Sequence, residues 1–462
     1  MTEPLTGIEH VVLLMFENRS FDNMLGAFYP ASANRGGVPS GWSNPYQGNN
    51  VSAWQAPVGS SAQTIPYPDP NELYANMQAQ INSSYGPMKG FVADYATVPN
   101  ATPQDIMQYY CAENVPVTYA LAMAYAATDR YFASGPVQTP PNRLFSLCGT
   151  PGYDTSTNQA YLNNTDYPLY PGIVGQLSYS SIFEQLDNAK ASWKVYFDDL
   201  LPIAALLDYV WENMEEKQQS VNVWPFEAFF DDVRNNALPA FSLIEPIYQM
   251  YGPKGDVAPN SNHPGSSSPF SDTGIPISIS CGEQMLATVF QALVANPTLF
   301  AKTLLIVTYD EHGGLFDHVT PPPAVSPFAN PVNNCKYNFY GVRVPTLFIN
   351  PYVQPGLFPP PSTTPLPSFD HTSILATLRD QFGLSGSLSP RVDQAPSFTG
   401  LVDPNRQPIT PPNITAPQCV WSPPSWQGHA APIVRTMLLR GSRQSRRRSE
   451  AISSPLKPAS RV

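Results

Sequence analysis

The chain has 462 residues, a formal net charge of -11 at pH 7 and an isoelectric point near 5.0. This acidic balance argues against binding of a nucleic-acid backbone, because nucleic-acid binders usually present a basic face. The 53 prolines, 28 glycines and 42% hydrophobic residues describe a loop-rich globular protein with a large core, not a disordered chain. A small anionic substrate would need a local cation.

Targeting signals and cysteine motifs are missing from the sequence. Residues 1–7 contain no basic or apolar export segment, and no later stretch is apolar for long enough to span a membrane. We therefore expect a cytoplasmic protein, or one exported by a route that the sequence does not identify. The five cysteines lack CxxC spacing, which predicts neither a zinc cluster nor a redox pair. Their odd number leaves at least one free thiol.

The first predicted element is a buried strand at residues 8–16, and it runs directly into a polar segment that begins Glu17-Asn18-Arg19. Residues 29–71 are crowded with Pro, Gly, Ser and Asn and predict a long irregular excursion that could cover a cleft. Helical periodicity returns at residues 103–127 and predicts two short helices that pack in the core.

A turn that ends at Gln138 precedes a predicted helix in which Thr139 is the N-cap and Pro140 the first helical residue. Capping is a sufficient reason for a threonine at this position. A hydroxyl at a helix N-terminus also faces free backbone amides and the positive end of the helix dipole, where a phosphate group would bind. The two roles are compatible.

The central stretch of the chain is predicted to contribute strands at residues 193–197 and 240–244 and a helix at residues 284–295. A further buried strand at residues 304–309 is rich in branched side chains and breaks into Asp310-Glu311-His312-Gly313-Gly314. These acids would lie at the carboxyl end of the strand, where open α/β sheets place their ligands.

Asp310 and Glu311 are neighbouring carboxylates that disfavour joint ionisation unless a cation neutralises them. The two glycines that follow allow a positive φ angle and the close approach of a ligand. A solvated turn after a strand is the alternative interpretation, because Asp, Glu and Gly are common turn residues. The segment alone does not separate a metal site from such a turn.

The C-terminal part begins with a predicted strand at residues 344–351, followed by a helix that Asp370 caps and that ends at Phe382. We divide the chain into a main domain at residues 1–385, an irregular extension at 386–440 that packs on it, and a basic disordered tail at 441–462. Within the extension, residues 386–424 are expected to be mostly coil.

The alternation of buried strands and helices predicts a mostly parallel α/β sheet with helices on both faces. Its polar loops hold most of the imidazoles in the chain. His10 lies in an apolar strand and is interpreted as a structural core residue, while His429 is left unassigned. The histidines in the polar loops are His263, His312, His318 and His371.

Four of these motifs, taken in order, resemble the phosphoesterase family that contains bacterial phospholipases C, plant non-specific phospholipases C and a group of acid phosphatases. The resemblance spans roughly residues 8–384. The motifs are Glu17-Asn18-Arg19-Ser20-Phe21-Asp22, Thr139-Pro140-Pro141-Asn142-Arg143, Asp310-Glu311-His312-Gly313-Gly314 with Phe316-Asp317-His318-Val319, and Asp370-His371-Thr372-Ser373.

The resemblance implies an alkaline-phosphatase-like three-layer α/β/α sandwich, with residues 1–385 as the catalytic domain, and a metal-assisted attack on phosphorus. Thr139 matches the nucleophile position. His263 and His371 match positions near the phosphate, and Asn142 would stabilise its oxygens, whereas His318 is expected to act from behind the site. The residues expected around the metal are Glu17, Asn18, Thr139, Asp310 and Glu311.

The residue types suit this chemistry. A threonine hydroxyl is a poor nucleophile at neutral pH and needs a base or a metal ion. Oxygen ligands favour calcium, magnesium or manganese, while the histidines leave zinc or iron open. In the expected course Thr139 attacks in line, a histidine protonates the leaving oxygen, and water hydrolyses the phosphothreonine. For Arg143 a structural ion pair is preferred over contact with the phosphate.

The sequence leaves three functions open. The first is phospholipase C cleavage of phospholipids, the second is an acid phosphatase acting on soluble monoesters, and the third is a binding protein without catalysis. Motifs for a phosphate site do not separate the first two, because these differ in the leaving group. The third is disfavoured because every expected reactive position is filled. We expect at most peripheral membrane contact, through a basic tail attracted to anionic lipid.

Overall fold

The computed structural model describes residues 3–32, 35–59, 63–167, 175–199, 201–215, 222–248, 251–252, 255–256, 258–265, 277–360 and 362–420. Among these residues, none of the helices combines the length and the apolarity that crossing a bilayer demands. The predicted tail at 441–462 and His429 lie outside the described residues.

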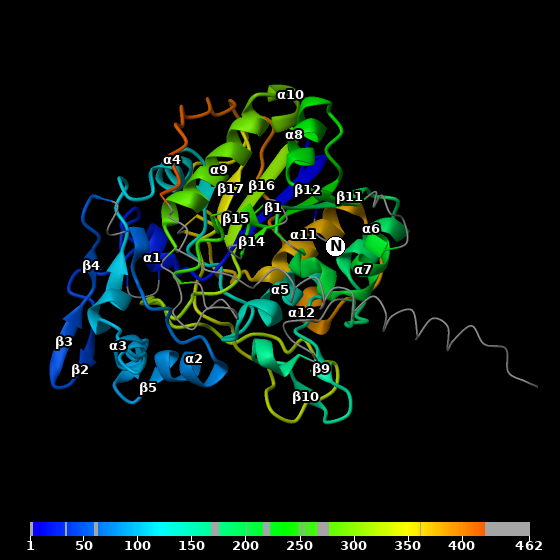
Figure 1. The fold of residues 1–462 in the computed structure, drawn as a ribbon. Helices are drawn as coiled ribbons and strands as arrows, with labels where there is room; N and C mark the ends of the chain where they lie inside the picture. The colour runs from blue at the N-terminus through cyan, green and yellow to red at the C-terminus, as the bar shows by residue number, and fades with distance from the viewer. Residues whose placement is uncertain are drawn as a thin grey trace, which may run out of the picture.

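The fold is built on an eight-stranded sheet with the order β12-β11-β13-β1-β16-β17-β8-β18 (Figure 1). All of its neighbouring strands pair in parallel except at β17, which runs antiparallel to both β16 and β8. The predicted mostly parallel sheet is thus confirmed. The strands are β1 (His10–Phe16), β8 (Ala126–Ala127), β11 (Trp193–Phe197), β12 (Val223–Pro225), β13 (Phe241–Ile244), β16 (Thr303–Tyr309), β17 (Leu347–Ile349) and β18 (Gly356–Leu357).

Helices cover both sides of the sheet, as predicted, and complete a three-layer α/β/α arrangement (Figure 1). One group packs around the long helix α9 (Ile279–Val294) and comprises α4 (Pro116–Ala124), α8 (Glu227–Arg234) and α10 (Pro297–Phe300). The other group packs around α5 (Thr139–Cys148) and α11 (His371–Phe382), with α6 (Ile182–Asn188), α7 (Asp208–Glu215) and α12 (Pro390–Gln394). Both faces of the central strands are therefore buried, and all seven residues of β16 are.

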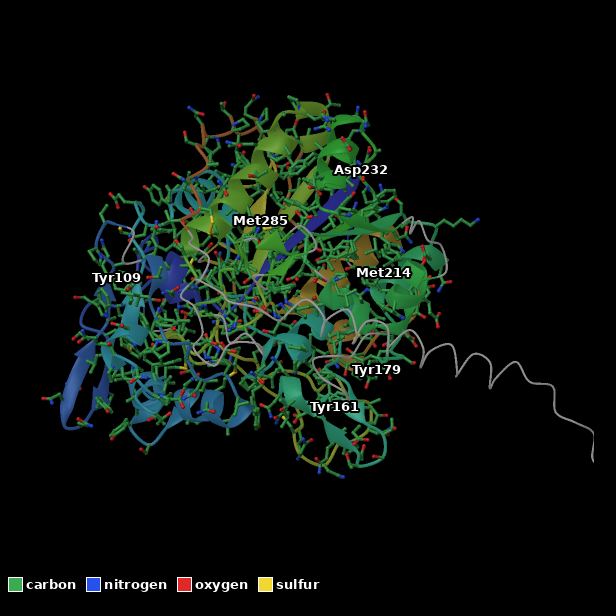
Figure 2. The ribbon with its side chains drawn as sticks, in the orientation of Figure 1. Tyr109, Tyr161, Tyr179, Met214, Asp232 and Met285 are labelled. Atoms are coloured by element: carbon green, nitrogen blue, oxygen red, sulfur yellow. A yellow bond between two sulfur atoms is a disulfide. The ribbon has the colours of Figure 1, made fainter. Side chains whose placement is uncertain are left out.

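Shorter strands and helices surround the eight-stranded sheet and its two helix layers. Met285 on α9 lies over the sheet, while Tyr161 and Tyr179 lie beside the hairpin of β9 and β10 (Figure 2). The short strands pair as β2 (Ser43–Tyr46) with β3 (Asn49–Ser52), β4 (Trp54–Gln55) with β7 (Gln108–Tyr109), β5 (Asn82–Ser83) with β6 (Gly86–Pro87), β9 (Tyr153–Asp154) with β10 (Gln159–Ala160), and β14 (Tyr251–Gly252) with β15 (Gly255–Asp256). The remaining helices are α1 (Phe21–Leu25), α2 (Tyr74–Ile81), α3 (Phe91–Tyr95) and the 3₁₀ turns Pro103–Met107, Asn164–Asp166 and Ile203–Leu206.

Two local predictions need correction. The excursion at residues 29–71 contains the β2–β3 hairpin, because backbone pairing satisfies polar groups that a bare loop would leave to water. The prediction of mostly coil after residue 386 agrees with the described residues 386–420, in which the short helix α12 is capped by Ser389. The N-cap of α5 is Gln138 and Thr139 is its first helical residue, since the extended backbone conformation ends at Gln138 (φ -72°, ψ -177°). The predicted cap at Asp370 is confirmed.

The C-terminal stretch of the described chain runs back over the main domain. Phe398 packs on Phe348 with ring centroids 4.6 Å apart, and Val402 pairs with Val353. A disulfide joins Cys419 to Cys281 at the start of α9 across 138 residues, a pairing that no sequence spacing indicated. The described chain leaves the thiols of Cys111, Cys148 and Cys335 free, in agreement with the odd count.

Candidate active site

The carboxylates of two neighbouring strands meet at one edge of the sheet. β1 and β16 pair in parallel with Phe16 opposite Tyr309, so the next residues, Glu17 and Asp310, leave their strands side by side. Both side chains are buried. The Asp310 backbone amide donates to the carbonyl of Phe16 (3.2 Å), which holds the two strand ends together.

Asn18 turns its side chain into the same region. Its φ angle is 56°, a left-handed conformation that asparagine tolerates better than most residues. Its backbone amide donates to Asp310 Oδ1 (3.1 Å). Its side-chain Nδ2 donates to Glu72 Oε1 and lies 3.0 Å from His263 Nε2. Asn18 Oδ1 is buried without a hydrogen-bond partner among the described residues.

Glu311 completes the predicted set of acids. Its Oε2 accepts from the amide of Gly313 (2.6 Å), while Oε1 is buried and has no partner among the described residues. The Gly pair has positive φ angles of 63° and 70°, as predicted. Its close neighbours are protein atoms: a Cβ at Gly313 would lie 2.5 Å from the Asn18 carbonyl, and one at Gly314 would lie 2.8 Å from Pro70 Cβ. The glycines therefore bring backbone segments together.

The segment around Pro70, which packs against Gly314, carries two acids that were not predicted as site residues. Asp69 comes from the proline-rich excursion and Glu72 directly follows it, and both lie beside His263: Asp69 Oδ1 is 3.4 Å from Nδ1, and Glu72 Oε1 is 3.6 Å from Nε2. The available signal was a pair of acids three residues apart in a loop otherwise poor in charge. That loop was expected to be a cover, so its acids were not weighed.

Burial raises the pKa values of these acids, whose charges also repel one another, and they therefore form one electrostatic cluster. Burial, and then the charge of Asp310, raises the pKa of Glu17 to about 8. The same two causes raise the pKa of Glu311 well above its ordinary value. Burial raises the pKa of Asp69, and burial followed by the charge of Asp69 raises the pKa of Glu72. Such carboxylates are poorly stabilised by the protein alone and fit a bound cation.

The donor set suits a divalent cation. Asn18 Oδ1 and Glu311 Oε1 are buried oxygens without partners, and the neighbouring carboxylates add further hard oxygen ligands. Buried polar atoms without partners are rare in proteins and call for a specific explanation. The acidic and histidine residues are thus compatible with divalent metal binding.

Thr139 lies at the N-terminus of α5 with 7% of its surface exposed. It precedes Arg143 by four residues and so shares a face of the helix with it. Arg143 Nε donates to Asp310 Oδ2 (3.2 Å), and Nη2 donates to the carbonyls of Met15 (3.1 Å) and Phe16 (3.0 Å). These bonds hold α5 against the ends of β1 and β16. Thr139 lies one helical turn from Arg143, toward the N-terminus of α5. The predicted ion-pair role of Arg143 is confirmed.

Asn142 is fully buried, and its side chain braces the turn in front of Thr139. Its Oδ1 accepts from the Gly135 amide (3.1 Å), and its Nδ2 donates to the carbonyls of Gly135 (3.2 Å) and Val137 (2.6 Å). The side chain therefore fixes the backbone that leads into α5.

The two predicted site histidines differ in their surroundings. His371 is fully buried; Nε2 donates to the Asp310 carbonyl (2.6 Å), and Nδ1 accepts from the Tyr131 hydroxyl (3.2 Å). Burial lowers the pKa of His371. His263 is 16% exposed, and burial lowers its pKa to about 4. His263 is thus at the rim of the cluster, and His371 is behind Asp310.

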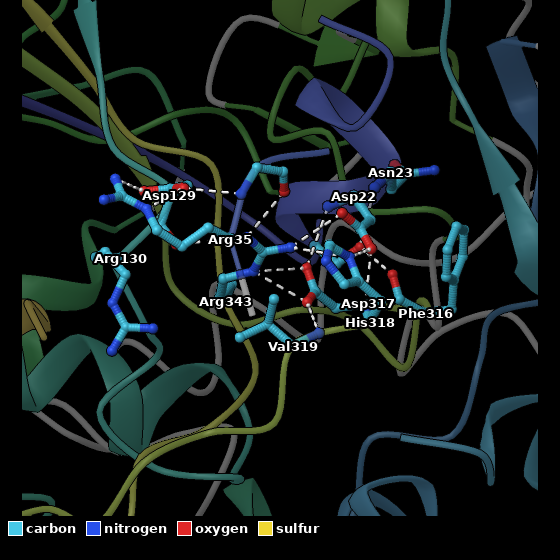
Figure 3. Close-up of polar contacts among 12 residues, drawn as sticks. Asp22, Asn23, Arg35, Asp129, Arg130, Phe316, Asp317, His318, Val319 and Arg343 are labelled. Atoms are coloured by element: carbon cyan, nitrogen blue, oxygen red, sulfur yellow. Dashed lines mark hydrogen bonds and ion pairs between the residues drawn. The ribbon is translucent and has the colours of Figure 1, made fainter. Parts of the chain in front are cut away.

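His312 and His318 hydrogen-bond to groups outside these acids, although His312 Nδ1 lies 3.5 Å from Glu311 Oε2. His312 Nε2 lies 2.8 Å from Gln80 Oε1 under the excursion. His318 belongs to a separate buried cluster with Asp22, Asp317 and Arg343 (Figure 3). Its Nδ1 donates to Asp22 Oδ2 (2.6 Å) and its Nε2 to a backbone carbonyl at Ser32 (2.9 Å). Both partners accept hydrogen bonds, which favours the imidazolium form of His318, and the side chain ties the excursion to the sheet.

Acids and a helix N-terminus gather at the carboxyl edge of a mostly parallel sheet, and the family match and named relatives that follow show a hydrolase that acts on phosphoester bonds. The family model described as "Phosphoesterase family" matches residues 8–385. The chain belongs to this family, as its four motifs predicted.

Two relatives named as phospholipases C agree with this assignment. The chain is 31% identical over 436 residues to Non-specific phospholipase C6 of Arabidopsis thaliana, covering 89% of this chain and 75% of the plant protein. It is 28% identical over 425 residues to Phospholipase C A of Mycobacterium tuberculosis, covering 82% and 74%. A solved protein in the alkaline phosphatase superfamily from Vibrio parahaemolyticus has a TM-score of 0.35 and 11% identity over 85% of this chain and 72% of that protein.

Proposed function

We propose that the chain is a metal-dependent phospholipase C that uses Thr139 as its nucleophile and releases the phosphorylated head group of a phospholipid. One observation carries the proposal: Arg143 clamps α5 onto Asp310 and the end of β1, which sets the helix that begins at Thr139 against the acids of both strand ends. The choice of phospholipid as substrate draws on the relatives that are named phospholipases C.

The candidate cation ligands are Glu17, Asn18, Thr139, Asp310 and Glu311. A divalent cation held there would supply Lewis-acid chemistry, lowering the pKa of a hydroxyl and offsetting the charge of a phosphate group. The amides at the N-terminus of α5 present further positive potential to the phosphate oxygens. His263 meets the reacting group from the rim of the cluster.

The proposed reaction has two steps. In the first, Thr139 Oγ1 bonds to phosphorus as the bond to the diacylglycerol oxygen breaks, and the proton lost by the hydroxyl ends on that oxygen. In the second, water attacks phosphorus, the bond to Thr139 breaks, and Thr139 Oγ1 recovers a proton from the water. The products are diacylglycerol and the phosphorylated head group.

Two predicted residues take positioning roles in this proposal. Asn142 fixes the turn that leads into Thr139, and His371 holds the Asp310 backbone through its Nε2 donor. Loss of either side chain should displace the nucleophile or a cation ligand by a fraction of an ångström. Displacements of that size are costly because attack requires a near in-line geometry.

The test compares wild type with Thr139→Ala and Thr139→Ser, and uses exposed Thr410→Ala as the matched control. Each protein is assayed on phosphatidylcholine and on an aryl phosphate, with calcium, magnesium, manganese or zinc added separately. We expect Thr139→Ala to lose at least about 10³-fold in rate, because a missing nucleophile leaves only binding and electrostatic effects. Thr139→Ser should keep part of the rate, and Thr410→Ala all of it.

Mass spectrometry of acid-quenched wild-type enzyme during turnover should find phosphocholine on Thr139 with phosphatidylcholine as substrate, and phosphate on Thr139 with the aryl phosphate. Turnover by Thr139→Ala at the wild-type rate would contradict the proposed nucleophile. Cleavage of the aryl phosphate without cleavage of the phospholipid would replace the phospholipase proposal by the acid phosphatase alternative.

A further inference from the structure

We propose that Tyr248 and Glu245 are positioning residues for the nucleophile. Together they hold the Arg143 guanidinium in the orientation that sets α5, and with it Thr139, against the strand ends. This inference rests on the proposed function, because it takes the start of α5 as the place of the attacking hydroxyl. Neither residue was among the site residues predicted from the sequence. Both belong to the segment that follows β13, which pairs with β1 on the side opposite to β16.

Glu245 leaves the sheet at the same edge as the acids of the site. β13 pairs in parallel with β1, and Leu14 lies opposite Ile244, so the next residue of β13 ends beside the end of β1. Glu245 is 2% exposed. Its Oε2 accepts from the amide of Ile203 (2.6 Å), and its Oε1 accepts from the amide of Ala204 (2.9 Å). With an amide donor on each oxygen, the carboxylate is fixed in one orientation.

Tyr248 links this carboxylate to Arg143. Its hydroxyl donates to Glu245 Oε2 (3.0 Å), and its backbone amide donates to Asp199 Oδ2 (2.7 Å). The Arg143 guanidinium carbon lies over the ring, 4.9 Å from its centroid. This distance is within the range of a cation–π contact. The ring is therefore held at its hydroxyl and at its backbone, and it presents its face to the guanidinium.

The hydrogen bonds of Arg143 leave the face of its guanidinium to this ring. Nε and Nη2 reach Asp310 Oδ2 and the carbonyls of Met15 and Phe16. Guanidinium donors point outward in the plane of the group, so these bonds fix its edge. Tyr248 covers its face. Loss of the ring would admit water beside the guanidinium, and water competes for the same three bonds.

The charges around Arg143 favour the same arrangement. Burial lowers the pKa of Arg143, but Tyr248 and the carboxylates of Asp310, Glu17 and Glu245 outweigh burial and raise the pKa. Burial raises the pKa of Glu245, and the charge of Arg143 opposes that rise. The guanidinium thus balances acids that end three neighbouring strands. Its position decides where α5 meets them.

The backbone that carries Tyr248 is tied to the framework of the fold. The Ile247 amide donates to Asn260 Oδ1 (2.7 Å), and the Asn260 amide donates to the Ile247 carbonyl (3.0 Å). The next residue along, Ser261, accepts from the Glu17 amide (2.7 Å) through its carbonyl. A residue that positions another side chain requires such a fixed support. The segment after β13, the loop at residues 258–265 and the end of β1 supply it together.

The first test measures the coupling between Tyr248 and Arg143 without any turnover. Urea midpoints are determined by circular dichroism for wild type, Tyr248→Leu, Arg143→Met and the double variant. Two residues that act through one contact have non-additive effects on stability. We expect Tyr248→Leu to lower the midpoint of wild type at least about twice as far as it lowers the midpoint of Arg143→Met. Equal shifts in the two backgrounds would overturn the inference.

The second test separates positioning from substrate contact by steady-state kinetics, on whichever of phosphatidylcholine and the aryl phosphate the wild type hydrolyses. Tyr248→Leu should lower kcat by about 10–100-fold and leave KM within about twofold, because a displaced nucleophile loses rate and not substrate affinity. Tyr248→Phe keeps the ring over the guanidinium and should recover at least about one third of the wild-type kcat. Glu245→Gln should lower kcat without a change in KM. Tyr85→Leu makes the same change at a tyrosine that is 57% exposed and should match wild type.

Three kinetic results would overturn the inference. The first is a wild-type kcat in Tyr248→Leu. The second is a raised KM with an unchanged kcat, which would place the ring on the substrate. The third is a Tyr248→Phe variant as slow as Tyr248→Leu. The urea cycle keeps the inference separate from the proposed nucleophile: turnover by Thr139→Ala at the wild-type rate would remove Thr139 from the mechanism and leave the measured coupling to Arg143 unchanged.

Discussion

Removal of the Arg143 side chain is the sharpest test of how the site is assembled. Its guanidinium is 3% exposed, pairs with Asp310 at 3.2 Å and donates to the carbonyls of Met15 and Phe16. Arg143→Met leaves the Asp310 carboxylate buried without this partner and removes one donor from the Met15 carbonyl and one from the Phe16 carbonyl, which keeps the Asp310 amide. Breaking a buried pair from one side costs about 3–5 kcal/mol.

This loss can be converted into a melting temperature. With an unfolding entropy of about 2.1 cal/mol/K per residue, roughly 400 folded residues lose about 1 °C for each kcal/mol. We therefore expect Arg143→Met to melt about 4–6 °C below wild type, as measured by circular dichroism. Arg143→Lys keeps the charge without the planar fork and should fall between the two proteins.

Arg234→Met is the control, because Arg234 and its partner Asp231 are 68% and 65% exposed. An exposed pair contributes about 1 kcal/mol at most, so its melting temperature should change by about 1 °C or less. The structural role of Arg143 would be refuted by a variant that melts like wild type but has lost activity and substrate affinity, since that result would place the guanidinium on the substrate.

Three further predictions concern the rest of the fold. His318→Gln should cost about 3–5 kcal/mol of unfolding free energy at pH 5.5, the range for a buried pair broken from one side. Burial lowers the pKa of His318, but the hydrogen bond to Asp22 outweighs burial and raises the pKa. The stabilisation is therefore complete below about pH 6.5 and is lost as the pH rises through the folded-state pKa. In urea titrations from pH 5.5 to 9, the stability difference between the variant and wild type should shrink, and a constant difference would contradict the imidazolium. Cys281→Ser should lower the free energy of unfolding by about 2–5 kcal/mol, because it removes the disulfide with Cys419. A reductant should lower the melting temperature of wild type but leave that of the variant unchanged. Equal melting temperatures of both proteins without reductant would show that the disulfide contributes nothing. Gly282→Ala should be destabilised by about 1–3 kcal/mol in the same urea assay, because its new Cβ would meet the Asn262 side chain, and a wild-type midpoint would mean that the loop before His263 yields freely.

Local pattern was enough to predict the framework and part of the site. Runs of branched apolar residues gave β1 and β16, and the polar residues that follow each run placed Glu17 and Asp310 at the edge where parallel strands end. The cap at Asp370 was equally local, since one side chain and the next three residues decide it. These features depend on neighbours in sequence, which is why composition and periodicity reveal them.

Some local details were decided by backbone geometry. The start of α5 shifted by one residue, with Gln138 as its cap, because an extended backbone at Gln138 leads directly into the helix. Asn142 was expected to face the phosphate, whereas its side-chain bonds go to the turn at Gly135 and Val137. A hydrogen-bonding side chain has many possible partners, and its own sequence position does not choose among them.

The tertiary structure alone decided which distant loops supply side chains to the site. Asp69 and Glu72 lie in a loop without periodicity, and tertiary contacts, among them Gly314 against Pro70 and Gly265 against Asp69, bring that loop to His263. The same holds for His318, which the fold assigns to a balanced ionic cluster. Sequence by itself determined a phosphoesterase with acids at the ends of two strands. Contacts between loops depend on close packing across the whole chain, and so the structure was needed to place Asp69 and Glu72 beside the acids of the strand ends.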